Sequence, residues 1–238
     1  MTRLCPFYAP SPDRALRCML FVLALLLPLA PGGAVELSCQ QNRDGAPAIE
    51  PALAERVCNV LDGFREQLAD CDLEPFDGVT FQIVDSLAAE RGDPLAGYNE
   101  SLDLIVLMSP DAVDQALTAH SPYSGVPAAA LYDSLIVHEL AHAYVARVAP
   151  RGAQYPMAQE YVSYVLQLSV MPTAAREVLL ERFPNSAPVK ASELNLFVAQ
   201  AAPVRFGVKA WRHFVQPDSG CDTLHRVLSG EAVFPQGY

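Results

Sequence analysis

The segment between Pro127 and Val148 constrains the fold most strongly, because its composition predicts one long and mostly apolar helix. Pro127 is suited to the first turn of a helix, whereas Pro150 and Gly152 oppose any continuation beyond Val148. Apolar side chains surround the few polar ones in this segment, so we expect the helix to be buried among the other elements of the domain.

Two histidines and a glutamate interrupt this apolar helix, in the order His138-Glu139-Leu-Ala-His142. Histidines four residues apart project from one face of a helix, so both imidazoles can reach the same metal ion. Glu139 adjoins the first histidine and can take a proton from a metal-bound water, which is the chemistry of a zinc hydrolase. The rival interpretation is a pair of histidines satisfied by core hydrogen bonds, but burying them beside a glutamate without a shared partner would be costly.

A zinc hydrolase needs a third protein ligand and one open coordination position. Val145 and Val148 stand where a longer histidine motif would place its glycine and third histidine, which excludes the metzincin arrangement. Glu160 is the first acidic residue after the motif, and it lies in the first turn of the next apolar helix, at about 157–170. A turn at 149–156 would fold that helix back against the first, which makes Glu160 the expected ligand. Its rival role is to complement the helix dipole.

The spacing of these residues resembles that of the gluzincins, zinc peptidases that combine an HExxH motif with a glutamate ligand on the next helix of the site. The matching segments are His138-Glu-Leu-Ala-His142 and Gln159-Glu160-Tyr-Val-Ser-Tyr164. The resemblance implies that His138, His142 and Glu160 bind Zn²⁺ and that Glu139 is the general base. It also implies a zincin-like core and a peptide or protein substrate, which could lie extended along the strand at 102–108 as the edge of the sheet.

This sequence departs from the gluzincin pattern in two places. Gln159 replaces the usual asparagine, and the interval from His142 to Glu160 is slightly shorter than usual. Gluzincins also use a tyrosine or histidine to stabilise the oxyanion. The candidates for that role here are Tyr123, Tyr132, Tyr164, His213 and His225, and the sequence does not distinguish among them.

The first 34 residues are predicted to be a signal peptide rather than part of the fold. Three arginines precede an apolar run of 11 residues at 19–29, and small residues follow up to Ala34. A run of this length cannot cross a hydrocarbon layer of ~30 Å. We therefore expect an exported protein, periplasmic or secreted, with no stable membrane anchor after cleavage.

The charge of the remaining chain excludes one class of partner. Removing three arginines and Asp13 from 16 basic and 27 acidic residues leaves 13 and 26, a formal charge of −13 over 204 residues. Nucleic acid is not an expected partner, because phosphate binding needs a basic face.

Four cysteines follow the predicted signal peptide, and an even number in an exported chain suggests two disulfides. Cys58 and Cys71 lie on one predicted helix, about 20 Å apart at 1.5 Å per residue, which is too far for a bond. Two pairings remain: Cys39–Cys58 with Cys71–Cys221, which we favour, or Cys39–Cys71 with Cys58–Cys221.

The pattern of the whole chain predicts a small mixed sheet followed by a mainly helical half that carries the active-site helix. The expected elements are a helix at 50–70, strands at 79–84 and 102–108 with a hairpin partner at 95–98, and helices at 110–119, 127–148, 157–170, 173–183, 191–200 and 204–216. Because strands precede most helices, we expect a single α+β, zincin-like domain over residues 35–238.

These observations lead to one main hypothesis and one alternative. The main hypothesis is an exported zinc-dependent hydrolase, specifically a peptidase, that uses zinc-activated water with Glu139 as general base. The alternative is a catalytically inactive zincin-like domain that acts as a binding protein.

Overall fold

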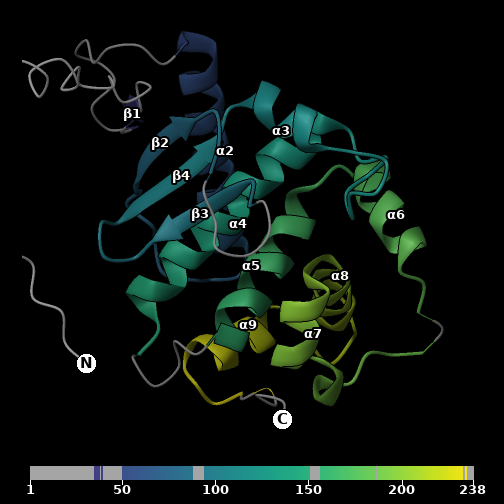
Figure 1. Cartoon of the computed structure of the whole chain (residues 1–238). Coiled ribbons are helices and arrows are strands. Elements are labelled where there is room, and N and C mark those ends of the chain that lie inside the picture. The colour runs from purple at the N-terminus through teal and green to yellow at the C-terminus, as the bar shows by residue number, and fades with distance from the viewer. Residues whose placement is uncertain are drawn as a thin grey trace, which may run out of the picture. The chain divides into compact units, whose positions relative to one another are not determined.

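A small mixed sheet and a larger set of helices make up the described part of the chain, which confirms the expected α+β class (Figure 1). The structure is a computed structural model that describes residues 35–37, 39, 50–87, 94–150, 156–185, 187–232 and 234. These residues fall in one compact unit, Ala34–Tyr238. The predicted signal peptide, residues 1–34, lies outside the described residues.

Four strands form the sheet in the order β1-β2-β4-β3. Their bounds are Val35–Leu37 for β1, Thr80–Val84 for β2, Ala96–Asn99 for β3 and Leu104–Met108 for β4. β2 and β4 run parallel, with Phe81 opposite Ile105, and both of these side chains are fully buried. β1 and β3 pair with their neighbours in the antiparallel sense.

The strand at 102–108 was expected to form the sheet edge, and this expectation is wrong. β4 lies inside the sheet because β3 folds back along it, so β3 is the edge on this side. A tight turn makes this possible: the Leu102 amide donates to Asn99 Oδ1 over 3.1 Å, and Asp103 adopts a φ of 49°. The backbone edge beside the helical half therefore belongs to Ala96–Asn99.

The helices are α2 Pro51–Asp70, α3 Pro110–Ala116, α4 Ala128–Val148, α5 Pro156–Val170, α6 Thr173–Arg182, α7 Leu196–Ala201, α8 Pro203–Phe214 and α9 Cys221–Leu228, with a 3₁₀ turn at Ala191–Glu193. The single helix expected at 191–200 is wrong. Asn195 caps a new helix by accepting from the Val198 amide over 3.1 Å, which separates α7 from the 3₁₀ turn. Among the described helices, none is both long and apolar enough to cross a membrane.

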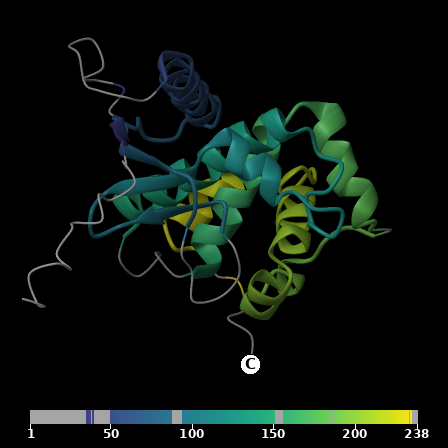
Figure 2. The same ribbon diagram turned by 45° about the horizontal axis from the view of Figure 1, so that its top comes forward.

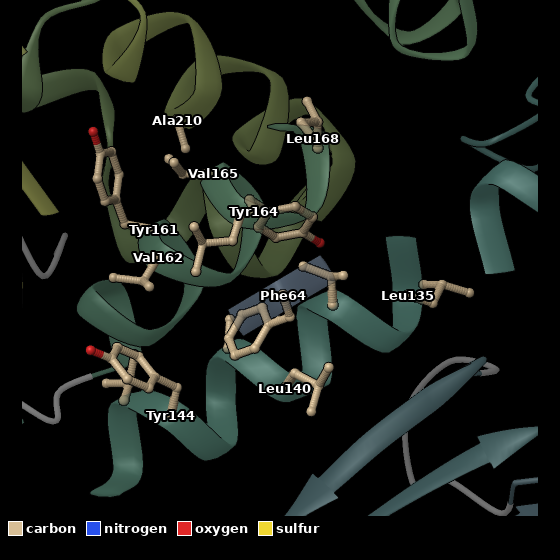
Figure 3. Close-up of a cluster of buried hydrophobic side chains, with 14 of the residues drawn as sticks. Phe64, Leu135, Leu140, Tyr144, Tyr161, Val162, Tyr164, Val165, Leu168 and Ala210 are labelled. Carbon is tan, nitrogen blue, oxygen red and sulfur yellow. The ribbon is translucent and has the colours of Figure 1, made fainter. Parts of the chain in front are cut away.

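Helix α4 lies at the centre of the packing, where it contacts α2, α5 and the edge strand β3. Figure 3 shows Phe64 of α2 beside Leu140 and Tyr144 of α4, and the rings of Phe64 and Tyr144 meet edge to face at 6.2 Å. α8 covers the other side of α5. In Figures 1 and 2, α6 to α8 gather on the side away from the strands. Dense packing of this kind holds α4 and α5 in a fixed relationship.

Two disulfides connect distant parts of the chain, and they are the pairing favoured from the sequence. Cys39 bonds Cys58 within α2, and Cys71 at the end of α2 bonds Cys221, the first residue of α9. The second bond joins residues 150 positions apart, so it ties the end of α2, which precedes strands β2 to β4, to the start of α9.

Candidate metal site

Helices α4 and α5 bring the three predicted ligands together. His138 and His142 project from α4, and their Nε2 atoms lie 3.1 Å apart. Glu160 is the fifth residue of α5. One of its carboxylate oxygens lies 3.9 Å from His138 Nε2 and the other lies 3.8 Å from His142 Nε2. The chain thus folds back after α4 as the sequence led us to expect, and one point in space lies within reach of all three side chains.

The distances fit a tetrahedral metal ion. Ligand atoms ~2.0–2.2 Å from zinc lie roughly 3.3–3.5 Å from one another in that geometry. The nitrogen pair at 3.1 Å is slightly closer than this, and the oxygen–nitrogen pairs at 3.8 and 3.9 Å are slightly wider. About a third of the Glu160 side chain is exposed. The carboxylate therefore has room to move toward the histidines until its oxygens reach the tetrahedral spacing. Two imidazoles and one carboxylate leave one coordination position open, as catalytic zinc requires.

The electrostatics of the metal-free site also suit a cation. Burial lowers the pKa of His142 to about 4, and burial together with the charge of His142 lowers the pKa of His138. Both imidazoles are therefore neutral at pH 7, the form that binds metal. Burial raises the pKa of Glu160 to about 7, and burial with the charge of Glu160 raises the pKa of Glu139 to about 8. A bound cation would favour ionisation of both carboxyl groups.

A buried glutamine orients the first histidine. His138 Nδ1 donates to Gln167 Oε1 over 2.9 Å, which leaves the lone pair of Nε2 for the metal. The amide of Gln167 is held in turn, because its Nε2 donates to Ser134 Oγ over 3.3 Å. Gln167 of α5 and Ser134 of α4 therefore hold His138 in the tautomer whose proton is on Nδ1.

Two glutamines whose roles were not predicted from the sequence support the candidate ligands. Gln167 contacts His138, and Gln159 forms a side-chain hydrogen bond with His142. A helical signal for one of them was present: Gln167 follows Glu160 by seven residues and therefore lies on the same face of α5. The other, Gln159, is the residue that stands where the gluzincin pattern has an asparagine.

Two pockets meet at Glu139. A pocket of about 790 Å³ lies on the His138 side, and its walls are largely apolar, including Leu87, Leu95, Ala96, Met108, Leu135 and Pro203. A smaller pocket of about 250 Å³ lies on the His142 side, between Tyr98, Glu100 and Gln159. Glu139 lines both, and β3 borders both, through Ala96 and Tyr98. The Glu139 carboxylate also accepts a hydrogen bond from the Tyr98 backbone amide, so β3 lies directly beside it.

Two of the five oxyanion candidates lie at the site. The Tyr164 ring packs against the His138 ring with centroids 4.5 Å apart, and Tyr164 and Tyr123 are hydrogen-bonded to each other. Tyr123 is also hydrogen-bonded to Gln167. Both tyrosines line the larger pocket with Glu139. Figure 3 shows Tyr164 and Tyr161 leaving α5 in different directions, with the Tyr164 hydroxyl on the side of Leu135.

The other three candidates are engaged elsewhere. Tyr132 packs under the guanidinium of Arg56, with 4.9 Å to the ring centroid. His213 is hydrogen-bonded to the Tyr161 hydroxyl over 2.9 Å, and His225 Nε2 donates to the backbone at the end of α2 over 2.7 Å. None of the three borders the two pockets at Glu139.

Comparison with known proteins gives one match. A family model described as "Family of unknown function (DUF6639)" matches residues 46–237. No curated protein and no solved structure matches the chain. The function has therefore to be argued from the site.

Proposed function

The chain belongs to the DUF6639 family, whose function is unknown, and we propose that it is a zinc-dependent hydrolase acting on peptide bonds. The observation that carries this proposal is the convergence of His138, His142 and Glu160 on one point beside a buried Glu139. A purely structural histidine pair would not require the Glu160 carboxylate from a second helix. Nor would it require a second carboxylate, that of Glu139, bordering two pockets.

Zinc is the cofactor that these ligands suit best. His138, His142 and Glu160 would hold it, with Gln167 and Gln159 orienting the imidazoles. When bound, zinc supplies a nucleophilic water at neutral pH and polarises a carbonyl group. The motif-bearing helix, the glutamate on the following helix and the antiparallel edge strand together support a zincin-like organisation of the gluzincin type.

Glu139 has the position of a general base. Its side chain is buried yet borders both pockets, so it can reach a water that attacks a bond lying across them. We infer that it accepts the proton of that water and then donates it to the departing amine. Tyr123 and Tyr164 present hydroxyl groups in the same pocket, where they can stabilise the carbonyl oxygen as negative charge develops.

The substrate we propose is an extended peptide or protein segment. On the side away from β4, β3 pairs with no other described strand. Its backbone groups other than the Tyr98 amide, which is hydrogen-bonded to the Glu139 side chain, can hydrogen-bond an added strand. The larger pocket beside this edge is walled mainly by apolar side chains and suits a bulky apolar side chain next to the scissile bond.

Metal analysis combined with cleavage assays tests the proposal. Zinc-replete wild-type protein should hold close to one equivalent, and His142→Ala should lose most of it. Glu139→Gln should keep the metal and lose cleavage of a peptide library. His225→Ala is the matched control, because this histidine is hydrogen-bonded at the far end of α2 and should keep both properties. Zinc well below one equivalent in the wild type, or zinc unchanged in His142→Ala, would contradict the proposal.

The rival proposal is a catalytically inactive zincin-like domain that acts as a binding protein. The sequence leaves the oxyanion donor undecided among five candidates. The placement of Tyr123 and Tyr164 in the larger pocket weakens the case for an inactive domain. A wild-type protein that binds zinc and peptides but cleaves no member of a broad library would favour this alternative.

We also propose that the protein is exported. Disulfides form and persist in oxidising compartments, and the two bonds of this fold support that location. N-terminal sequencing of the protein from its native source should begin near residue 35, and a mature chain that begins at Met1 would contradict export by a cleaved signal.

A further inference from the structure

Tyr123 reaches the site from a loop that precedes the metal-binding helix. The loop connects α3 with α4 and turns tightly at this residue: the Tyr123 amide donates to Ser121 Oγ over 3.2 Å, and its carbonyl accepts from the Val126 amide over 3.0 Å. Gly125 adopts a φ of +84°, a conformation that other residues rarely take. The ring of Tyr123 is thereby directed into the pocket that contains Glu139.

One arginine holds this turn from the outside. Arg182, the last residue of α6, donates from Nη1 to the carbonyls of Ser121 and Pro122, over 2.9 and 3.2 Å, and from Nη2 to that of Ser124 over 2.5 Å. The three acceptors bracket Tyr123 in the chain. A guanidinium is planar and presents its donors in a fixed fork, so it sets the position of all three carbonyls together.

The helix that carries Arg182 follows directly on the helix that carries Glu160 and Gln167. The loop is therefore tied to the same helical pair at two points: at its backbone by Arg182, and at the Tyr123 hydroxyl by Gln167 and Tyr164. We propose that Arg182 is a positioning residue, which sets where the Tyr123 hydroxyl lies relative to Glu139 and the metal ligands. This inference rests on the proposed hydrolase function.

The expected effect on activity exceeds the effect on stability. The hydrogen bonds of Arg182 are exposed, so their loss should change the melting temperature little. Misplacement of a reacting group by about 1 Å, by contrast, can lower turnover ~100-fold. Arg212 provides a matched control, since it donates to the carbonyls of Leu180 and Phe183 at the same end of α6 without touching the Tyr123 loop.

The experiment compares Arg182→Ala, Arg182→Lys and Arg212→Ala, alone and combined with Tyr123→Phe. Arg182→Ala should lower kcat ~10–100-fold with little change in KM or zinc content, whereas Arg212→Ala should leave kcat near the wild-type value. Arg182→Lys should restore only part of kcat, because one ammonium cannot replace the fork. In the Tyr123→Phe background, Arg182→Ala should cause no further loss, as two residues acting through one hydroxyl are not additive.

A second measurement does not depend on activity. In zinc-loaded protein labelled with 3-fluorotyrosine, the Tyr123 resonance is identified by its absence in Tyr123→Phe. It should shift in Arg182→Ala and stay in place in Arg212→Ala. An unmoved resonance, a fully additive double variant, or equal losses of kcat in both arginine variants would overturn the inference. A zinc-loaded wild type without turnover would defeat the proposed function instead, and the resonance would then still decide whether Arg182 positions Tyr123.

Discussion

Gln167 Oε1 lies 2.9 Å from His138 Nδ1, so a residue of α5 determines which nitrogen of an α4 histidine faces His142 and Glu160. The same glutamine is hydrogen-bonded to Ser134 and to Tyr123. One buried amide therefore couples ligand orientation to the position of a hydroxyl in the pocket.

Gln167→Leu should weaken zinc binding by roughly 10–100-fold, the usual effect of removing a partner of a ligating histidine. Competition with a chelator of known affinity would measure the change. Gln67→Leu is the control, because Gln67 donates to the Leu166 carbonyl of the same helix without contacting a ligand. Equal zinc affinities in the wild type and Gln167→Leu would show that the hydrogen bond does not orient His138.

Gly207→Ala should disturb the candidate metal site indirectly, by displacing the ring of Tyr164. A β-carbon at this position would lie 2.3 Å from Tyr164 Cδ1, so the ring would have to move, and it packs on His138. We expect a loss of about 1–3 kcal/mol in the free energy of unfolding together with reduced peptide cleavage. Gly63→Ala, in the middle of α2 with open space around it, should instead stabilise the fold by roughly 0.5–1 kcal/mol. Urea unfolding of both variants would separate the two effects.

The contribution of Glu139 to the stability of the metal-free protein should fall as pH rises. Burial and the charge of Glu160 raise the pKa of Glu139 from 4.5 to about 8, so this carboxyl keeps its proton in the fold at pH values where the unfolded chain has lost it. Its contribution is fully present below pH 4.5 and is lost as the pH rises through 8. In chelator-treated samples, the melting temperatures of Glu139→Gln and wild type should diverge between pH 5 and 8, and the variant should melt at the higher temperature. A constant difference across this range would contradict the assignment.

The two disulfides should contribute unequally to stability. Cys71–Cys221 closes a loop of 150 residues and Cys39–Cys58 one of 19. Loop-closure entropy gives the longer bond an advantage of about 2 kcal/mol. Denaturant unfolding of the two double serine variants should therefore show the larger loss for Cys71→Ser with Cys221→Ser, and a larger loss for the short loop would refute this ranking.

Local sequence signals predicted the parts of the site that lie on regular helices. The spacing of His138 and His142 depends only on helix geometry, and Glu160 was identified because it stands alone in an apolar first turn. Helix geometry likewise excluded a Cys58–Cys71 bond and left two pairings, of which the structure shows the favoured one.

The contacts that the sequence did not predict depend on tertiary packing. Arg182 meets carbonyls about sixty residues earlier in the chain, and carbonyls have no sequence signature. The hairpin partner expected at 95–98 is present as β3, Ala96–Asn99. By pairing with β4 it takes the edge position that the family resemblance had assigned to the strand at 102–108. The helix α9 was not predicted either; it is short, and its first residue, Cys221, is bonded to the end of α2.

The position of Cys221 near the end of the chain has a consequence for biosynthesis. When a ribosome or a translocon has delivered only the first two hundred residues, Cys71 is already present and its partner is not. Once α2 has formed, its length keeps Cys58 out of reach of Cys71 during that interval. The Cys71–Cys221 bond therefore forms only after residue 221 has emerged, and a chain truncated before residue 221 would leave Cys71 without this partner.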